Sequence, residues 1–254
     1  MKNLRLAAFG AATALLVATT GVNAQGFSDQ QRKEIQQIVK EYLIQHPEVL
    51  QEVATELEKR QAAAEADRNK AALAKNREAV FNSPYQVTLG NPQGDVTLVE
   101  FFDYNCGYCK RALGDKVELL KNDPKLRLVL KEFPVLGPGS IEAAQVAVAV
   151  RMQDKTGKKY FDFHQRLMSG RGQADKARAL AAAKDAGLDM ARIEKDLGSE
   201  EVRKSLQESM AIAESLGING TPTYVVGDQV VAGAVGLDNL KKQIAAARSG
   251  SATR

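Results

Sequence analysis

The stretch DVTLVEFFDYNCGYC, residues 95–109, joins a dense run of β-branched and aromatic residues to a pair of cysteines. Its first part, residues 95–102, is almost unbroken in apolarity, which is typical of a central strand covered on both faces. We expect a helix over 106–121 and another strand over 126–133. A strand, a helix and a strand at this spacing predict a βαβ unit with parallel pairing and a right-handed crossover.

Further strands and helices flank this unit. Gly227 and Asp228 form a two-residue turn typical of a β-hairpin, and Ser140 is placed to cap the helix after the βαβ unit. Residues 155–215 contain no convincing strand and predict several helices. The additional strands are expected at 87–89, 223–226 and 229–232. The sequence therefore predicts an α/β fold whose sheet is interrupted by a helical insertion at about 140–215.

The composition limits the class of protein. The chain has 254 residues, 44% of them hydrophobic, and a formal net charge of +4 from 35 basic and 31 acidic side chains. These values are typical of a globular protein and argue against a low-complexity or disulfide-dense chain. The signs of charge are mixed along the sequence, so we expect no nucleic-acid partner.

The first 24 residues resemble a secretory signal peptide. Lys2 and Arg5 precede an apolar run over 6–18, and Val-Asn-Ala at 22–24 resembles a cleavage site. The alternative, an uncleaved anchor helix, is weaker because the run is shorter than the ~20 residues needed to cross a bilayer. We therefore expect export to a compartment where thiols can be oxidised and remain so.

Residues 25–80 have a composition of their own and predict a helical extension. Ser28 and Gln31 form a plausible capping box, and Pro47 separates two amphipathic stripes. The run 58–78 has Leu73 as its only large apolar residue, so it resembles a solvated connecting rod. The stripes are too short to be stable alone. Self-association of the stripes is the favoured interpretation, and folding back onto the body is the alternative.

The two cysteines, Cys106 and Cys109, lie where the expected strand passes into the expected helix. A structural zinc site would need His46 and His164 as further ligands, and neither has finger-like spacing. A disulfide that closes so small a loop constrains the unfolded chain very little. The favoured interpretation is a redox-active dithiol. The helix N-terminus would stabilise the Cys106 thiolate, and Cys109, one turn further on, would be more shielded and would resolve a mixed disulfide.

Residues 100–109 resemble the active-site segment of the DsbA-like branch of the thioredoxin superfamily. Phe133-Pro134, Ala143-Ala144 and the Gly-Thr-Pro-Thr of 220–223 are also similar to that branch. The resemblance begins at about Tyr85 and continues to the C-terminus. It implies a thioredoxin fold with an inserted helical domain, thiol–disulfide exchange on protein cysteines or disulfides in the bacterial periplasm, and no cofactor.

The resemblance also implies roles for two residues. Pro222 matches the cis-proline that the family places opposite its active-site cysteines, and cis bonds are tolerated essentially only before proline. Glu100 matches a buried acid beneath the active site. On a covered strand, desolvation would raise its pKa and suit it to shuttle the proton of Cys109. The alternative for Glu100 is an exposed strand face.

The departures from typical DsbA oxidases indicate a narrower group. Gly107 and Tyr108 separate the cysteines, whereas typical oxidases have His in place of Tyr108. Thr221 before the proline is the choice of periplasmic isomerases. Together with the N-terminal extension, these features resemble the suppressor-of-copper-sensitivity C (ScsC) proteins, some of which are trimeric disulfide isomerases, and related outer-surface proteins of the Com1 type. The resemblance implies a homo-oligomer, with a trimer favoured, copper tolerance as a context, and a membrane redox partner of the ScsB/DsbD or DsbB type.

The expected organisation is a signal peptide at 1–24, a helical extension and linker at 25–80, and a DsbA-like domain at 81–254. The favoured function is a disulfide isomerase or reductase. An oxidase that introduces disulfides is the alternative within the same chemistry. A copper-binding or client-binding protein, with Cys106 and Cys109 as soft Cu(I) ligands, is the alternative of another class.

Overall fold

The computed structural model describes residues 26–154 and 156–251, in two compact units that meet in sequence between Glu58 and Lys59. The signal peptide expected at 1–24 lies outside these described residues. Within the described ranges, no helix is both long enough and apolar enough to cross a membrane.

The first unit is helical. The α1 helix covers Asp29–Gln45, and α2 begins at Pro47. Ser28 caps α1 as expected: its hydroxyl accepts from the Gln31 amide at 3.2 Å, and the Gln31 side chain accepts from the Ser28 amide at 2.9 Å. No residue of α1 is buried. The exposed apolar side chains of this unit are Phe27, Ile35, Ile38, Val39, Tyr42, Ile44, Leu50, Val53 and Leu57.

The α2 helix extends to Phe81, and its last turns belong to the core of the second unit. Leu73, Val80 and Phe81 are buried in one cluster with Val99, and the Asn76 side chain donates to the Ser215 hydroxyl at 3.0 Å. The expectation of a solvated rod over 58–78 is therefore wrong for its C-terminal part. Leu73 lies two helical turns before Val80, and this widely spaced stripe is enough to dock the helix end.

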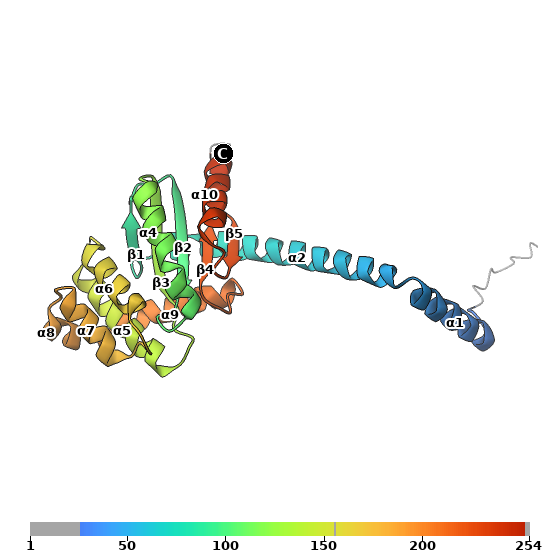
Figure 1. Ribbon diagram of the computed structural model, residues 1–254, viewed down its shortest axis with the longest axis horizontal. Coiled ribbons are helices and arrows are strands. Elements are labelled where there is room, and N and C mark those ends of the chain that lie inside the picture. Colours follow the sequence, from blue (N-terminus) through green and yellow to red (C-terminus); the bar gives the residue numbers. More distant parts are fainter. Residues whose placement is uncertain (1–25, 155, 252–254) are drawn as a thin grey trace, which may run out of the picture. The chain divides into compact units, whose positions relative to one another are not determined.

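The second unit contains a five-stranded sheet in its described part, with the strand order β1-β3-β2-β4-β5 (Figure 1). The central pair, β2 and β3, is parallel, and the other neighbours are antiparallel. The strands are β1 (Val87–Gly90), β2 (Val96–Phe102), β3 (Leu126–Glu132), β4 (Thr223–Val226) and β5 (Gln229–Ala232). This mixed sheet with its parallel βαβ core confirms the predicted α/β, thioredoxin-like fold.

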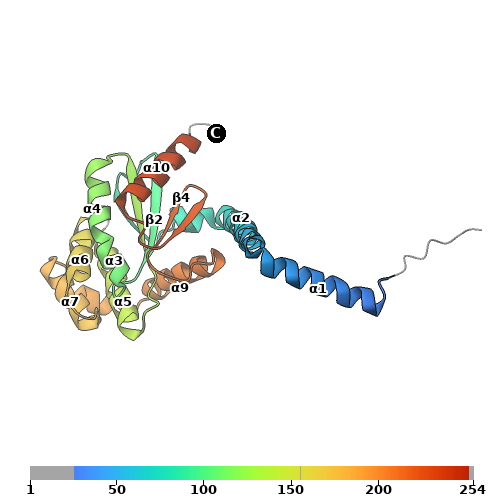
Figure 2. The same ribbon diagram turned by 45° about the vertical axis from the view of Figure 1, so that its right-hand side comes forward.

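Helices fill the connections of the sheet. The α5, α6 and α7 helices gather together in both views and contact one another (Figures 1 and 2). Together with α8 and α9, they separate β3 from β4 in the sequence. The helices of this unit are α3 (Gly107–Arg111), α4 (Leu113–Asn122), α5 (Pro138–Gln153), α6 (Lys158–Ser169), α7 (Lys176–Asp185), α8 (Met190–Asp196), α9 (Glu200–Ser215) and α10 (Leu237–Ser251).

The alternation of side chains along β2 sets the two layers of the core. Leu98 and Phe102 belong to one buried cluster, which includes residues of α4 and α10, whereas Val99 and Phe101 belong to the other. Successive side chains of a strand point to opposite faces. Glu100 therefore points to the same face as Leu98 and Phe102, where the residues around the cysteines lie.

Two local expectations are wrong. The helix expected over 106–121 is interrupted at Ala112, where α3 ends before α4 begins. Ala112 is a strong helix former and Leu113 after it is apolar, so the local sequence gives no sign of the break. Ser140 does not cap α5: Gly137 is the N-cap and Pro138 occupies the first turn. The Ser140 hydroxyl instead donates to Asp103 at 2.8 Å.

Candidate active site

The two cysteines occupy different environments at the carboxyl end of β2. Cys106 is the N-cap of α3 and is 6% exposed, whereas Cys109 lies within α3 and is fully buried. Both are free thiols. Burial raises the pKa of Cys109 strongly, and the negative charge of Glu100 raises it further. Cys109 is therefore a protonated thiol at neutral pH, and Cys106 is the more accessible of the two.

Thr221 and Pro222 lie next to Cys106. The peptide bond between them is cis, as the resemblance led us to expect, and the Cys106 thiol donates to the Thr221 carbonyl at 3.1 Å. The antiparallel pairing of β4 with β2 brings this segment to the cysteines, because Thr223 pairs with Phe101 near the end of β2. The cysteines and the Thr-Pro segment, 115 residues apart in sequence, thus form one site.

Glu100 lies in a buried ion pair that was not expected from the sequence. Its side chain and that of Lys116 are both inaccessible to solvent, and the Lys116 ammonium nitrogen lies 2.8 Å from each carboxylate oxygen. Only Oε1 accepts a hydrogen bond; Oε2 is buried without one in the described part of the chain. The exposed strand face considered for Glu100 is thus ruled out. Lys116 was missed because a lysine is almost never fully buried unless it is paired.

Burial and the lysine act in opposite directions on Glu100. Burial, the larger effect, raises the pKa of Glu100, and the Lys116 charge lowers it. On β4, Tyr224 pairs with Glu100 across the sheet, and burial raises the pKa of this tyrosine. The Tyr224 hydroxyl has no hydrogen-bond partner among the described residues. Glu100 therefore shares with Cys109 a buried region in which charge is costly.

Asp103 organises the loop that carries Cys106. Its carboxylate accepts hydrogen bonds from the amides of Asn105 at 2.7 Å, Val135 at 2.8 Å and Leu136 at 3.0 Å, and from the Ser140 hydroxyl. One carboxylate thus joins the active-site turn to the loop between β3 and α5. No sequence signal beyond its place before the cysteines pointed to this role.

A second buried polar network lies behind the active-site turn. The Tyr104 hydroxyl lies 3.4 Å from a carboxylate oxygen of Glu132 and 3.3 Å from both the Tyr160 hydroxyl and Nδ1 of His164. Tyr160 donates to the same Glu132 oxygen at 2.6 Å. Burial raises the pKa of Glu132 well above its usual range and lowers that of His164. Glu132 and His164 are thus both held toward their neutral forms.

The two residues between the cysteines lie at the surface. Gly107 begins α3, and the Tyr108 ring is 60% exposed. The Arg111 guanidinium lies over this ring, 4.2 Å from its centroid. A cation over an aromatic face is an attractive arrangement, so Arg111 helps to hold Tyr108 beside the cysteines.

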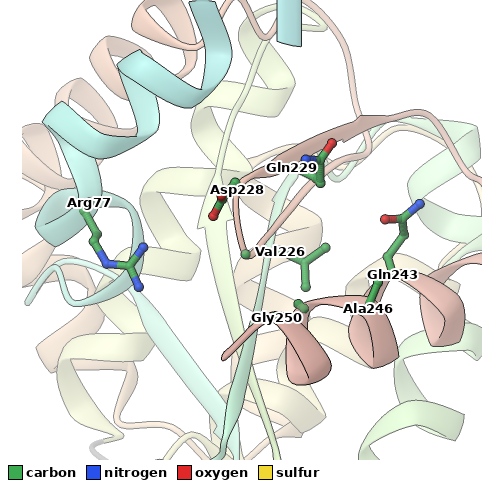
Figure 3. Close-up of a pocket in the computed structure, with 9 residues that line it drawn as sticks. Arg77, Val226, Asp228, Gln229, Gln243, Ala246 and Gly250 are labelled. Carbon is green, nitrogen blue, oxygen red and sulfur yellow. The ribbon is translucent and has the colours of Figure 1, made fainter. Parts of the chain in front are cut away.

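The described residues include no group of three or more His, Cys, Asp or Glu side chains that could hold a metal ion. His46 pairs with Glu48 in the first unit, and His164 belongs to the network of Tyr104 in the second. A cavity of 390 Å³ lies at the other end of β4, by the turn to β5 (Figure 3). Arg77, Asp228 and Gln243 are among the residues that line it, and it includes none of the expected site residues.

Comparison with known proteins settles the family. The family model described as the DSBA-like thioredoxin domain matches residues 97–245. The chain belongs to this family. A second model, the copper resistance protein ScsC N-terminal domain, matches residues 31–64. The resemblance to DsbA-like proteins with an ScsC-type extension is thereby confirmed.

Two solved structures illustrate the similarity of this chain to known oxidoreductases and ScsC proteins. A thioredoxin-like oxidoreductase from Silicibacter pomeroyi DSS-3 is 45% identical, with 68% of this chain and 98% of that chain covered and a TM-score of 0.65. A linker-deletion mutant of Proteus mirabilis ScsC is 27% identical, with 89% of this chain and 99% of that chain covered and a TM-score of 0.66.

Curated relatives add one disulfide protein. The disulfide bond formation protein D of Bacillus subtilis (strain 168) is 26% identical over 171 residues, which cover 63% of this chain and 75% of the relative. The chain also matches sodium/proton antiporters such as NhaA 1 of Salinispora arenicola, and it spans about a quarter (25%) of the length of that relative.

Proposed function

We propose that the protein is a thiol–disulfide oxidoreductase that acts on protein disulfides. The observation that carries this proposal is the asymmetry of the cysteine pair: Cys106 caps α3 beside the Thr221 carbonyl, whereas Cys109 is buried and its pKa is raised. A thiolate is the attacking species in disulfide exchange. A first thiol that is slightly exposed and a second thiol that is protonated and fully buried are what ordered attack and resolution require.

The proposed reaction has two steps. The Cys106 thiolate attacks one sulfur of a client disulfide; a bond forms between these sulfurs, the client bond breaks, and the other client sulfur leaves as a thiolate that takes up a proton. Cys109 then loses its proton and attacks the Cys106 sulfur. The client is released as a dithiol, and the protein holds the disulfide between its two cysteines. When a client thiolate attacks the mixed disulfide first, the client is isomerised and the protein dithiol is restored.

Glu100 is the proposed acceptor of the Cys109 proton. Its charge raises the pKa of Cys109, so the two groups lie close together, and burial raises the pKa of Glu100 itself. A carboxylate with a raised pKa is a better base than an ordinary one at neutral pH. Lys116 is the proposed positioning residue, since it holds Oε1 and partly offsets the desolvation of the carboxylate.

The favoured activity is isomerisation or reduction of client disulfides, as opposed to the introduction of new ones. The exposed apolar stripe of α1, with Ile38 and Tyr42 among its members, supports self-association of the first unit. The ScsC-type match over residues 31–64 supports the same conclusion, and a trimer is the favoured assembly. Several active sites around one misfolded client would favour repeated exchange. Assembly would also limit access of an oxidising membrane partner of the DsbB type, whereas one of the ScsB/DsbD type would keep the dithiols reduced.

The proposed setting is the periplasm. The N-terminal sequence, with Lys2 and Arg5 before an apolar run, supports export, and clients would be proteins that carry cysteines or disulfides. The solved structures similar to this chain include a periplasmic thioredoxin-like protein from Salmonella enterica serovar Typhimurium, 25% identical with a TM-score of 0.61.

Refolding of scrambled ribonuclease tests whether the protein acts as an isomerase. The chain beginning at Gln25 should restore ribonuclease activity in a redox buffer, and a chain beginning at Lys59 should lose most of this ability while it keeps insulin-reducing activity. The shorter chain retains Leu73, Val80 and Phe81, so its core is intact. Light scattering on both chains gives the assembly state.

Two results would contradict the favoured activity. Equal isomerisation by both chains would refute the link between assembly and isomerisation. A monomeric long chain that oxidises reduced ribonuclease and does not reshuffle the scrambled form would favour the oxidase instead.

A further inference from the structure

The surface on one side of Cys106 is basic. Lys110 and Arg111 belong to α3, and Arg171 and Arg178 belong to the segment before and at the start of α7. We name these four side chains the basic rim. The three arginines are exposed and Lys110 is half-buried.

Direct contacts fix the rim beside the cysteines. The residue before Cys106, Asn105, donates to the Ala174 carbonyl at 2.8 Å and accepts from the Ala174 amide at 2.6 Å. The Lys110 ammonium donates to the Gly172 carbonyl at 3.3 Å. The segment that carries Arg171 is thereby attached to the active-site turn at two points.

The two remaining guanidinium groups are placed by their neighbours. A β-carbon built on Gly172, whose φ is +79°, would lie 2.8 Å from Nη1 of Arg178, so Arg178 covers this glycine closely. Arg111 bends back over Tyr108, and its Nη1 would lie 3.8 Å from a β-carbon on Gly107, the residue after Cys106. Arg178 therefore belongs to the attached segment, and Arg111 lies beside Gly107, the residue that follows Cys106.

The basic rim has no acidic partner among the residues that the structure describes. In the described ranges, none of its four side chains forms an ion pair. Two carboxylates bind backbone groups of this segment: Asp175 accepts from the Arg178 amide, and Glu142 of α5 accepts from the Lys176 amide. Unpaired charges of one sign around a reactive group raise the local concentration of oppositely charged partners.

We propose that the basic rim selects client segments that carry Asp or Glu beside the attacked disulfide. This inference rests on the proposed thiol–disulfide exchange and adds a specificity to it. An acidic segment that docks on the rim brings its sulfur to Cys106, and carboxylates can pair with the arginines in two-point contacts. The benefit lies mainly in the rate of encounter, which electrostatic complementarity governs more than it governs the final affinity.

Three synthetic peptides test the rim. Each carries one cysteine joined by a disulfide to 2-mercaptoethanol, with two glutamates, two glutamines or two lysines on each side. The reduced protein is mixed with each peptide, the reaction is quenched with acid, and the products are quantified by mass spectrometry. At low salt the glutamate peptide should react about tenfold faster than the lysine peptide. The ratio should fall toward one at about 1 M salt, where the screening length is about 3 Å.

Charge reversal at the rim supplies the matched comparison. The double variant Arg171→Glu with Arg178→Glu should abolish or invert the preference. The double variant Lys121→Glu with Lys125→Glu, at the far end of α4 and just beyond it, reverses the same number of exposed charges and should leave the preference unchanged. An equal ratio for all peptides in the unmodified protein would overturn the inference. An equal loss in the double variant of Lys121 and Lys125 would overturn it as well, because net charge alone would then explain the preference.

Hydroxyethyl disulfide, which is uncharged, separates this inference from the proposed function. All variants should react with it at the same rate. If the protein reacts with hydroxyethyl disulfide but shows no preference for acidic peptides, the proposed thiol–disulfide exchange stands and the proposed selection by the basic rim is refuted. Failure to react with any disulfide would refute the proposed function itself.

Discussion

Glu100 and Lys116 form an ion pair with no solvent access, and Glu100 lies close enough to Cys109 for its charge to raise the pKa of that thiol. Moving two charges out of water is costly, and their attraction offsets this cost only when both partners are present. The pair therefore stabilises the folded protein only as a unit. The same burial raises the pKa of Glu100, which makes this carboxylate a stronger base than an ordinary one.

Removing either partner should destabilise the protein strongly. We expect Lys116→Met and Glu100→Leu each to lower the free energy of unfolding by about 3–5 kcal/mol, because each leaves a buried charge alone. The double variant should lose less than the sum, with a coupling of about 1–3 kcal/mol. Urea unfolding of the reduced protein measures all three.

The exposed pair Glu200–Lys204, with 2.9 Å between its charged groups, is the matched control. Glu200→Leu and Lys204→Met should show a far smaller coupling in the free energy of unfolding, since exposed ion pairs are screened by solvent. Additive losses at the buried pair would contradict the account. So would a Lys116→Met variant that reacts with disulfides as fast as the unmodified protein.

At the scale of elements, the buried network connects the helical insertion to the sheet and to the active-site turn. Glu132 ends β3, Tyr160 and His164 belong to α6, and Tyr104 precedes Cys106 by two residues. All four are fully or almost fully buried. A neutral Glu132 can donate or accept a hydrogen bond here, whereas an ionised one would carry an unpaired charge into the core. Burial therefore favours the protonated form of Glu132 in this network, since it raises the pKa of the acid.

The raised pKa of Glu132 predicts that the free energy of unfolding depends on pH. The folded protein keeps a proton on Glu132 that the unfolded chain releases above about pH 4.5, so the free energy of unfolding falls as pH rises toward the raised pKa. Glu132→Gln replaces the neutral acid with an amide and removes this loss. At pH 4 the two proteins should have similar stability, and above about pH 5 the variant should gain about 1.4 kcal/mol per pH unit relative to the unmodified protein.

Thermal and urea unfolding between pH 4 and pH 8 measure this difference, in which the titration of all other groups cancels. Tyr160→Phe, which removes the 2.6 Å hydrogen bond but leaves the acid, should be less stable yet retain the pH dependence of the unmodified protein. If the free energy of unfolding changed with pH in the same way for Glu132→Gln and the unmodified protein, Glu132 would be ionised in the folded state and the prediction would be wrong.

Elements with a strong local signal were predictable from the sequence. The β4–β5 hairpin has its expected bounds because a Gly-Asp turn separates two β-branched runs, and the Ser28 capping box formed as expected. The break at Ala112 and the cap at Gly137 were missed. The Ser140 hydroxyl binds Asp103, a distant residue that periodicity does not reveal, and the residues around Ala112 carry no local signal of a helix end.

At the scale of the whole molecule, the cysteines and the Thr221–Pro222 segment could be placed in one site because the family resemblance supplied their pairing. Lys116, Asp103 and the basic rim could not, because their roles depend on which segments the fold brings together. Leu73 shows the same limit: an isolated leucine in a polar run gave no sign that the end of α2 joins the core.

The central claim is that Cys106 attacks the client and Cys109 resolves the adduct. Trapping of the mixed disulfide tests it most directly. The account predicts that Cys109→Ser, incubated with scrambled ribonuclease and then alkylated, accumulates a covalent adduct whose mass is the sum of the two proteins. A reductant should cleave this adduct into the two proteins, and the disulfide that joins them should involve Cys106. The Cys106→Ser variant should form none. An adduct of similar yield through Cys109 in the Cys106→Ser variant would contradict the assignment of roles.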